Sequence, residues 1–503
     1  MPRRPDLMKD WDRLPAAERR ARSIDRLRRY LKTQVLPYSP FYARKAAEWR
    51  LDPDALRTWD DLRRIPFTVK QDLLPTPERP NGAKDFILHP TAETIRARAP
   101  KSELLKLAAR RLVSGGKAVE RALVAEYAPA SVIFTTGRSS GSVPFFLTPY
   151  DDRILLESGR RITRLLGLEA GKDRTVSLFP YAPHLAFWQV AYCGMATGVL
   201  TLNTGGGKIM PTDKLVGAIE TMQPTCVAGM PGFFYHVLRR AAEAGRDFSS
   251  VKVVALGGEN VPPGFKAKVS DSLAKVGAPE AKIASVLGFT ESRMCWTECV
   301  GADRTGFHTY PEWSLFEIVD PDTGEPLPEG STGELVYTSL DGRGTPVIRY
   351  RTGDVVEGGL IETEPCPGCG RHVTRIRSNL RRRSNVKALD VGKIKGSLVN
   401  LNALSELFAG DRDLEEWQLE IRKRNDDPME VDEVVLHAAL RAGVERAAFE
   451  RRIRDAVRAA AEVGLNDVFV EDTPALLRRI GMETLQKEER IVDRRPKPET
   501  AAR

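Results

Sequence analysis

The sequence predicts an α/β protein with a large N-terminal domain and a smaller α+β C-terminal domain. Strand-like and helix-like segments alternate between about residues 175 and 286, a pattern typical of parallel-type sheets with helices on their faces. Residues 312–356 contain short strand-like runs joined by glycine-bearing turns, which predicts a small antiparallel subdomain. The composition becomes arginine-rich near residue 377, so we place the domains at residues 1–380 and 381–503.

The elements follow in order along the chain. Helical periodicity from residue 10 to residue 33 ends before Pro37, and a basic helical segment at 104–123 matches no pattern known to us. The apolar run at 131–134 predicts a short buried strand. The alternating region then comprises a helix at 151–168, a strand at 175–180, a strand at 198–202, a helix at 214–222, a strand at 225–228, a helix at 233–244, a strand at 251–256, a helix at 264–276 and a strand at 282–286. Strands at 417–421 and 431–438 and a helix within 450–463 form the C-terminal domain.

Composition limits the class of protein. The 503 residues are 42% hydrophobic and 29% charged with a mean hydropathy of -0.32, which is typical of a soluble globular protein with a large core. No run of eighteen apolar residues occurs and the N-terminus lacks the apolar core of a secretion signal, so we expect a cytoplasmic protein without a membrane partner. The six cysteines would then be reduced rather than paired in disulfides.

The net charge of +9 is compatible with nucleic-acid binding. The arginines, however, are interleaved with acids along helical segments and are not gathered with aromatic residues. Solvated helix faces and attraction for an anionic substrate explain the charge better, and we expect no nucleic-acid partner.

A glycine- and hydroxyl-rich stretch follows the predicted strand at 131–134. Gly137 and Gly141 permit close approach of the backbone to a ligand, and the neighbouring hydroxyl and N–H groups are donors suited to phosphate oxygens. Such a run is by itself more often a plain surface loop. No lysine follows the second glycine, so it is not the common nucleotide-binding loop ending in Gly-Lys-Ser/Thr.

Three further stretches appear in order: Leu-Gly-Gly-Glu at 256–259, Gly-Phe-Thr-Glu at 288–291 and Ile-Arg-Tyr-Arg-Thr-Gly-Asp at 348–354. Together with the glycine-rich loop, their order and spacing resemble those of the adenylate-forming (AMP-dependent synthetase/ligase) superfamily, and most closely the phenylacetate-CoA ligase family. The segments at 40–45, 59–62, 65–73, 320–328 and 332–336 extend this resemblance beyond the loops.

The resemblance implies a carboxylate that attacks the α-phosphorus of ATP and releases pyrophosphate, with Mg²⁺ and fixed donors balancing the charge. Thr290 would donate to the α-phosphate, Glu291 would hold Mg²⁺ and Asp354 would accept the two ribose hydroxyls. The implied nucleotide-binding residues are Thr135, Thr136, Gly137, Ser139, Ser140, Gly141, Gly257, Gly258, Glu259, Gly288, Phe289, Asp354 and Arg375.

A lysine of the smaller, mobile domain normally completes the adenylation site in this family. Residues 487–495 resemble the family's lysine segment, and Lys487 is the corresponding residue. A point cation beside the α-phosphate stabilises the transition state, so we predict Lys487, with Thr290 and Glu291, as catalytic. The alternative is a solvated lysine in a charged tail.

The acid-binding residues are less well defined. Tyr181, His184 and Phe187 follow the predicted strand at 175–180, which leads towards the expected pocket. Their aromatic character suits an aryl or arylacetic acid, although an aromatic cluster is also common in a protein core.

Cys366 and Cys369 have the two-residue spacing of a zinc half-site. Cys299 and His308 lie in a region that, in the family that the chain resembles, folds back towards this turn. They would complete a closed Cys₃His site of structural Zn²⁺. The alternative is a pair of reduced thiols in a tight turn.

Three positions depart from the family pattern. Proline comes one place late in the glycine-rich loop, at Pro144, and Leu287 replaces the usual tyrosine before Gly288. The family's hinge and CoA-channel loop fall on altered residues, at 381–385 and 390–396. These changes leave the adenylation motifs largely intact and count against transfer to CoA.

The resemblance as a whole implies an AMP-forming ligase that transfers an aromatic acyl group to CoA. Two alternatives stay open: transfer of the adenylate to an amine, hydroxyl or other small nucleophile, or an inactive relative that binds nucleic acid or protein. The expected partners are a small carboxylic acid, ATP and CoA, with a second copy of the chain in a possible homodimer.

Overall fold

A computed structural model describes residues 10–135, 142–382, 401–427, 430–461, 464–485 and 488–495. Its central feature is a six-stranded sheet in the order β4-β3-β5-β6-β7-β8. The strands from β3 to β7 are parallel, whereas β8 is antiparallel to β7. This sheet confirms the predicted α/β class. Its strands are β3 (Arg174–Pro180), β4 (Leu200–Gly205), β5 (Cys226–Gly229), β6 (Val253–Gly257), β7 (Lys282–Phe289) and β8 (Met294–Thr297).

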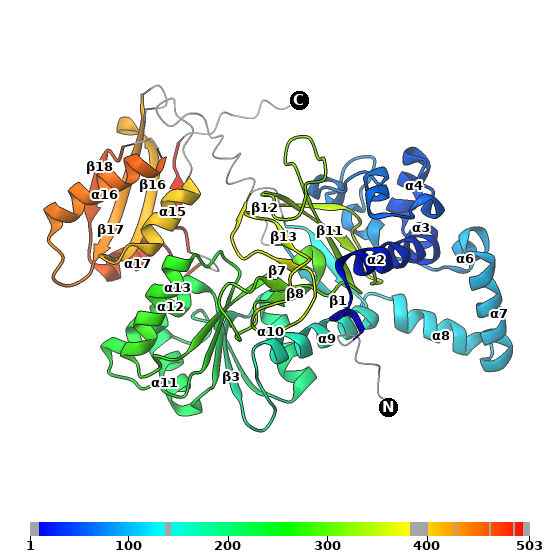
Figure 1. The fold of residues 1–503 in the computed structure, drawn as a ribbon, viewed down its shortest axis with the longest axis horizontal. Coiled ribbons are helices and arrows are strands. Elements are labelled where there is room, and N and C mark those ends of the chain that lie inside the picture. Colours follow the sequence, from blue (N-terminus) through cyan, green and yellow to red (C-terminus); the bar gives the residue numbers. More distant parts are fainter. Residues whose placement is uncertain are drawn as a thin grey trace.

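Helices cover both faces of this sheet (Figure 1). Because side chains alternate along a strand, Cys226 and Ala228 of β5 join one core cluster and Val227 joins the other. Burial on both faces explains the nearly continuous apolar runs in β5 and β6. One face carries α9 (Pro149–Leu165) and α10 (Leu185–Thr197), and the other carries α11 (Thr212–Met222), α12 (Pro231–Glu243) and α13 (Pro263–Lys275).

Two small antiparallel sheets follow in sequence, as predicted for this region. The larger has the order β10-β11-β12-β15 and the smaller β13-β14-β9. The predicted domain boundary falls within β15. The strands are β9 (Phe307–His308), β10 (Ser314–Val319), β11 (Gly333–Ser339), β12 (Tyr350–Val356), β13 (Leu360–Ile361), β14 (Arg375–Ile376) and β15 (Leu380–Arg382).

The N-terminal region is helical and differs from the prediction at two points. The first helix does not end before Pro37, because it continues through a π-helical turn, Leu31–Val35, into α3 (Leu36–Tyr38), which contains that proline. The basic segment is two helices, α7 (Lys101–Ser114) and α8 (Gly116–Tyr127), rather than one. The helices separate at Gly115, whose φ of 79° is readily adopted by glycine. The preceding helices are α2 (Ala16–Tyr30), α3 (Leu36–Tyr38), α4 (Pro40–Trp49), α5 (Lys70–Leu73) and α6 (Ala92–Arg98).

The predicted buried strand at 131–134 was wrong in its environment. β1 (Ser131–Phe134) pairs only with β2 (Pro144–Leu147) among the described residues, as an antiparallel hairpin. Val132 is exposed and the adjacent Ile133 is buried, because a two-stranded hairpin has one face in contact with solvent. The glycine-rich stretch therefore connects the two strands of a hairpin.

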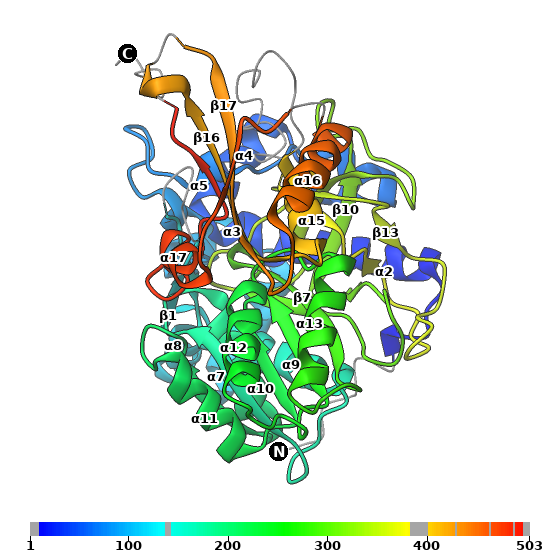
Figure 2. The same cartoon turned by 90° about the vertical axis from the view of Figure 1, so that its left-hand side faces the viewer.

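The C-terminal region has its own sheet, in the order β18-β17-β16-β19, covered by helices (Figure 2). Lys268 of α13 donates to the carbonyl of Leu414 at 2.6 Å, and Arg441 donates to the hydroxyl of Tyr235 at 3.2 Å, so this region packs on α12 and α13. Among the described residues, no helix has the length and apolar character needed to cross a bilayer. The elements are α15 (Leu401–Gly410), β16 (Leu414–Lys423), β17 (Asp432–Leu440), α16 (Arg446–Ala461), β18 (Asp467–Val470), α17 (Thr473–Arg479) and β19 (Ile491–Asp493).

Candidate active site

Two of the predicted motifs meet at the carboxyl edge of the central sheet. Gly257 ends β6 and pairs with Val286 of the adjacent β7, which ends at Gly288 and Phe289. Gly258 has a φ of 86°, a conformation that favours glycine. The chain then turns through the short 3₁₀ helix Thr290–Ser292. Ligands of such sheets bind at this edge, so the motifs occupy the expected position.

The backbone carbonyl of Phe134 joins three segments that are distant in sequence. It accepts a hydrogen bond from Thr290 Oγ1 at 3.3 Å, and His184 Nδ1 lies 2.8 Å from it. The Phe134 N–H donates to the carbonyl of Pro183 at 2.7 Å. The end of β7, the segment before α10 and the start of the glycine-rich stretch therefore meet at one point.

The base of the glycine-rich stretch is closed by hydrogen bonds. Thr135 exchanges bonds with Val143: its N–H donates to the Val143 carbonyl at 3.0 Å, and its hydroxyl accepts from the Val143 N–H at 2.9 Å. Ser142 Oγ donates to the Thr135 carbonyl at 2.8 Å. The five other predicted loop residues, Thr136, Gly137, Ser139, Ser140 and Gly141, lie outside the described residues.

Glu291 and Asp354 are connected through β12. The Tyr350 hydroxyl donates to Glu291 Oε1 at 2.9 Å. Tyr350 and Asp354 are four residues apart in the same strand, whose register is irregular between Arg351 and Val355, where Gly353 has a φ of 74°. The Asp354 N–H donates to Thr352 Oγ1 at 3.1 Å, which fixes the backbone at the Thr-Gly turn.

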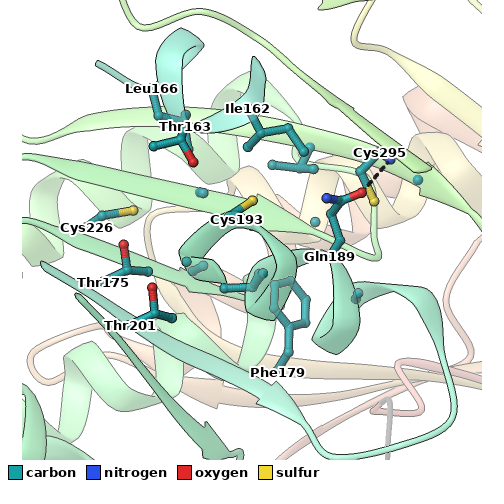
Figure 3. Close-up of a pocket in the computed structure, with 18 of the residues that line it drawn as sticks. Ile162, Thr163, Leu166, Thr175, Phe179, Gln189, Cys193, Thr201, Cys226 and Cys295 are labelled. Carbon is teal, nitrogen blue, oxygen red and sulfur yellow. Dashed lines mark hydrogen bonds between the residues drawn. The ribbon is translucent and has the colours of Figure 1, made fainter. Parts of the chain in front are cut away.

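A cavity extends from this edge between the sheet and the helices α9 and α10 (Figure 3). Gly257, Gly258 and Gly288 line the end nearest the motifs. Its empty volume, including the open mouth, is about 800 Å³. Cys226 at the far end pairs with Val253, four residues before Gly257. At ~3.3 Å per strand residue, the cavity follows the sheet for ~13 Å.

The cavity is apolar and carries no charge: its lining includes no Asp, Glu, Lys, Arg or His among the residues that the structure describes. Its polar side chains bond within the protein. Thr163 donates to the Gly159 carbonyl at 2.9 Å, and Gln189 accepts from the Cys295 N–H at 3.1 Å. Burial raises the pKa of Cys193 to about 12, so this thiol is neutral at neutral pH. Such a lining suits an uncharged, apolar group.

The three predicted acid-binding residues are not among those that line this cavity. Tyr181 is 65% exposed and contacts Phe187 edge-on, with ring centroids 5.0 Å apart. The cavity is lined instead by another face of α10, at Leu185, Gln189 and Cys193. Their spacing of four residues places them on one helix face, and this periodicity is the sequence signal that could have identified them.

Lys487 lies outside the described residues, but the residues after it are placed. Glu488 is buried, and a side chain at Gly232, in the first turn of α12, would collide with its carboxylate. Burial and the nearby Glu259 carboxylate raise the pKa of Glu488 to about 7, while Arg490 opposes this shift. The segment after Lys487 is therefore close to the predicted Leu-Gly-Gly-Glu motif.

Arg375 lies in another sheet. It is in β14, and its guanidinium donates to the carbonyls of Thr305 and Glu364, both at 2.8 Å. The backbone of Arg375 pairs with His308 of β9. The structure thus places Arg375 beside the predicted metal ligands.

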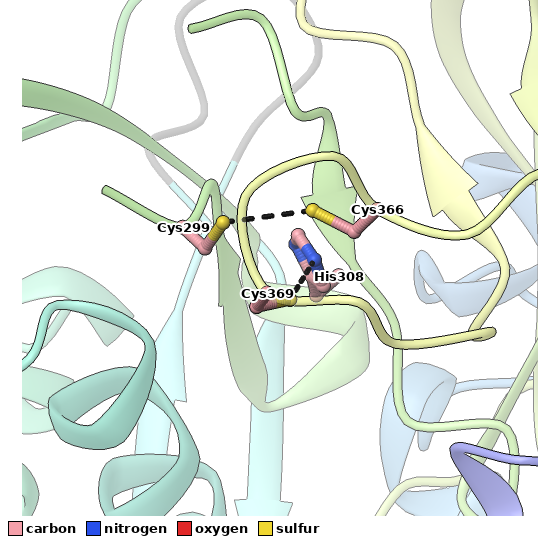
Figure 4. Close-up of side chains that lie close together, drawn as sticks. All are labelled: Cys299, His308, Cys366 and Cys369. Atoms are coloured by element: carbon pink, nitrogen blue, oxygen red, sulfur yellow. Dashed lines mark hydrogen bonds between the residues drawn. The ribbon is translucent and has the colours of Figure 1, made fainter. Parts of the chain in front are cut away.

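The four predicted zinc ligands converge (Figure 4). One ligand atom from each of Cys299, His308, Cys366 and Cys369 lies within 4.8 Å of all the others. The sulfurs of Cys299 and Cys366 are 3.6 Å apart, close to the ~3.8 Å expected for two sulfurs bonded to one tetrahedral Zn²⁺. His308 Nδ1 lies 3.1 Å from the Gly306 carbonyl, which leaves Nε2 towards Cys369. The donor set and its spacing fit a zinc ion.

Comparisons with known proteins agree with this geometry. Residues 155–340 match the AMP-binding enzyme family. Phenylacetate-coenzyme A ligase of Thermus thermophilus is 27% identical over 73% of this chain and 71% of its own length. The corresponding ligase of Aromatoleum evansii is 26% identical over 95% of both chains. A crystal structure of 2-hydroxyisobutyryl-CoA ligase in the postadenylation state, 19% identical, superposes with a TM-score of 0.75 over 98% of this chain and 94% of that one.

The fold and these matches indicate the class of protein: the chain is similar to adenylate-forming enzymes of the AMP-binding type. Within that class the chain resembles the phenylacetate-CoA ligases, as its motifs predicted.

Proposed function

We propose that this enzyme is an AMP-forming ligase that activates an apolar carboxylic acid with ATP and transfers the acyl group to CoA. The observation that carries the proposal is the uncharged cavity whose mouth, at Gly257, Gly258 and Gly288, adjoins Thr290 and Glu291. An acid with its apolar part in this cavity would present its carboxylate at the edge of the sheet where the nucleotide-binding motifs meet.

In the first half-reaction a carboxylate oxygen forms a bond to the α-phosphorus of ATP while the bond to the β-phosphate oxygen breaks and pyrophosphate leaves. Thr290 would donate to the α-phosphate, Glu291 would hold Mg²⁺, and Asp354 would bind the ribose hydroxyls. The hydrogen bond between Tyr350 and Glu291 supports this arrangement, because it orients the Glu291 carboxylate. Its donor, Tyr350, lies in β12, the strand that also carries Asp354.

Lys487 would supply the cation beside the α-phosphate. The burial of Glu488 against Gly232 supports this assignment, since it holds the adjoining segment against the large domain on the side of Glu259. The second half-reaction would break the acyl–phosphate bond as the CoA thiol sulfur attacks, releasing AMP and a proton.

The substrate is proposed to be an aromatic or arylalkyl acid that carries no charge other than its carboxylate. The names of the relatives support an arylacetic group, and the ~13 Å length of the cavity leaves room beyond one ring. Charged side chains would be disfavoured, because the lining offers no counter-charge.

Transfer to a non-CoA nucleophile remains the second candidate. The specific observation that favours it is the sequence at 381–385 and 390–396, where the residues differ from the family's hinge and CoA-channel loop. CoA is the leading acceptor because the phenylacetate-coenzyme A ligase from Aromatoleum evansii matches over 95% of the chain.

The Cys₃His cluster is proposed to hold a structural Zn²⁺. Four protein ligands leave no open position, so the ion would link the segment after β8 to the turn at 366–369 and take no part in the reaction.

Pyrophosphate exchange into ATP, measured across a panel of aromatic, arylalkyl and linear acids, tests the adenylation step. We expect exchange that depends on the acid and on Mg²⁺. Lys487→Ala should reduce it by ~10²–10³-fold, the usual effect of removing one charge-stabilising group, with an unchanged melting temperature. Exchange that Lys487→Ala leaves intact would remove the assignment of that lysine, and absence of exchange with every acid would contradict the proposed function.

A further inference from the structure

The helices α7 and α8 project from the N-terminal region at the edge of the molecule opposite the C-terminal sheet (Figure 1). None of the fourteen residues of α7 is buried, and α8 buries only Tyr127. At the base of this hairpin, Tyr127 donates to Gln34 at 2.6 Å and Arg343 donates to Glu126 at 2.8 Å. The hairpin is thus anchored at one end and exposed along its length.

The outer face of α7 is apolar. Leu105, Leu112 and Val113 are 72%, 87% and 86% exposed, and the last two are the most exposed large apolar side chains among the described residues. Ala108 and Ala109, also exposed, lie between them in the helical sequence. Spacings of three and four residues place these side chains on one face of the helix, where no described residue covers them.

Basic residues flank this face. Residues 92–127 contain eight Lys or Arg and four Glu. Lys106 pairs with Glu103 at 2.7 Å, but Arg110, Arg111 and Arg121 form no ion pair with any residue that the structure describes. An exposed apolar face bordered by cations is the pattern of helices that lie in the interface of a bilayer.

We propose that the α7–α8 hairpin binds the surface of an anionic lipid bilayer. Leu105, Leu112 and Val113 would enter the boundary between headgroups and acyl chains, and the arginines would extend to the lipid phosphates. Charge complementarity favours this partner over a second copy of the hairpin, because two copies would bring two basic surfaces together. The expectation of no membrane partner rested on the lack of a spanning segment, which does not bear on surface binding.

Sedimentation of the full chain with vesicles tests the proposal. We expect the protein to pellet with vesicles of equal parts phosphatidylcholine and phosphatidylglycerol, and to remain in solution with phosphatidylcholine alone. Binding should fall as salt rises, because screening weakens the attraction of the arginines. Failure to pellet with the anionic vesicles at low salt would overturn the proposal.

Two variants separate the hairpin from the rest of the surface. Leu112→Glu with Val113→Glu should lower vesicle binding roughly tenfold or more, because the apolar face is lost and two negative charges are added. Ile209→Glu, at a position 67% exposed outside the hairpin, is the matched control and should bind like the parent. Arg110→Glu with Arg111→Glu should also weaken binding and serves if the first variant does not fold. The lipid partner would be contradicted if the hairpin variants bound the vesicles as well as the parent does. It would also be contradicted if the parent formed a dimer in solution that these variants dissociate.

Discussion

The Tyr350 hydroxyl donates a hydrogen bond of 2.9 Å to the Glu291 carboxylate and so links β12 to the turn after β7. The bond connects two motifs that lie almost sixty residues apart, and it orients the carboxylate proposed to hold Mg²⁺. Orientation of a ligand by a neighbouring hydrogen bond commonly affects the affinity for the metal.

Tyr350→Phe should therefore raise the Mg²⁺ concentration needed for half-maximal pyrophosphate exchange. One hydrogen bond is worth about 0.5–1.5 kcal/mol, which corresponds to a roughly two- to tenfold change. Tyr337→Phe is the matched control, because its hydroxyl bonds Ser339 at 3.2 Å and not Glu291. An identical Mg²⁺ titration for Tyr350→Phe and the parent would argue against Glu291 as the Mg²⁺ ligand.

Glu488 should make stability depend on pH. Its folded-state pKa of about 7 lies above the ordinary value of 4.5, so its contribution is fully present below pH 4.5 and is lost as the pH rises through 7. Between pH 4.5 and pH 7 the melting temperature of Glu488→Gln should consequently fall less than that of the parent. The parent should lose at most about 3 kcal/mol more of its free energy of unfolding over this range. The exposed Glu489→Gln is the control; a parent-like slope in Glu488→Gln would refute this account of Glu488.

Zinc should be present in near-stoichiometric amount in the purified protein, as measured by elemental analysis. Removing it with a chelator, or replacing one ligand by Cys366→Ser, should lower the melting temperature by several degrees. Each kcal/mol lost from the free energy of unfolding lowers the melting temperature by ~2–4 °C. Cys226 lines the apolar cavity and is not part of the Cys₃His cluster, so Cys226→Ser should retain the metal. A purified chain that contains no zinc would contradict the assignment.

Filling the far end of the cavity should restrict the accepted substrates to shorter acids. Cys226→Leu should lower kcat/KM about tenfold or more for the longest substrates, because each methylene that no longer fits costs about 1–3 kcal/mol. The shortest active acid should be used as before, which also shows that the variant folds, and Cys226→Ser should preserve the original ranking. If all acids declined equally, the cavity would not be the acyl site.

Much of this architecture was predictable because the signals are local. Gly257 and Gly288 end adjacent strands at one edge of the sheet, as the alternation of strands and helices predicted. The cysteine spacing likewise identified a turn whose ligands converge with Cys299 and His308.

Other features depend on tertiary packing. The run at 131–134 is apolar, but its strand pairs in a hairpin with one face open, so Val132 is 37% exposed. The aromatic residues Tyr181 and Phe187 pack on each other, whereas the cavity is lined by a face of α10 that does not include Phe187. Arg375 bonds carbonyls beside the cysteine cluster, a partner choice that no local pattern specifies.

The central claim is that the acid is activated with ATP and passed to CoA. The most direct measurement is the mass of the product formed from ATP, Mg²⁺ and the best acid of the panel, with and without CoA. We predict an acyl-CoA and AMP when CoA is present, and an acyl-adenylate without it. Acyl-adenylate or free acid as the product even with CoA would contradict transfer to CoA and favour another nucleophile as the acceptor.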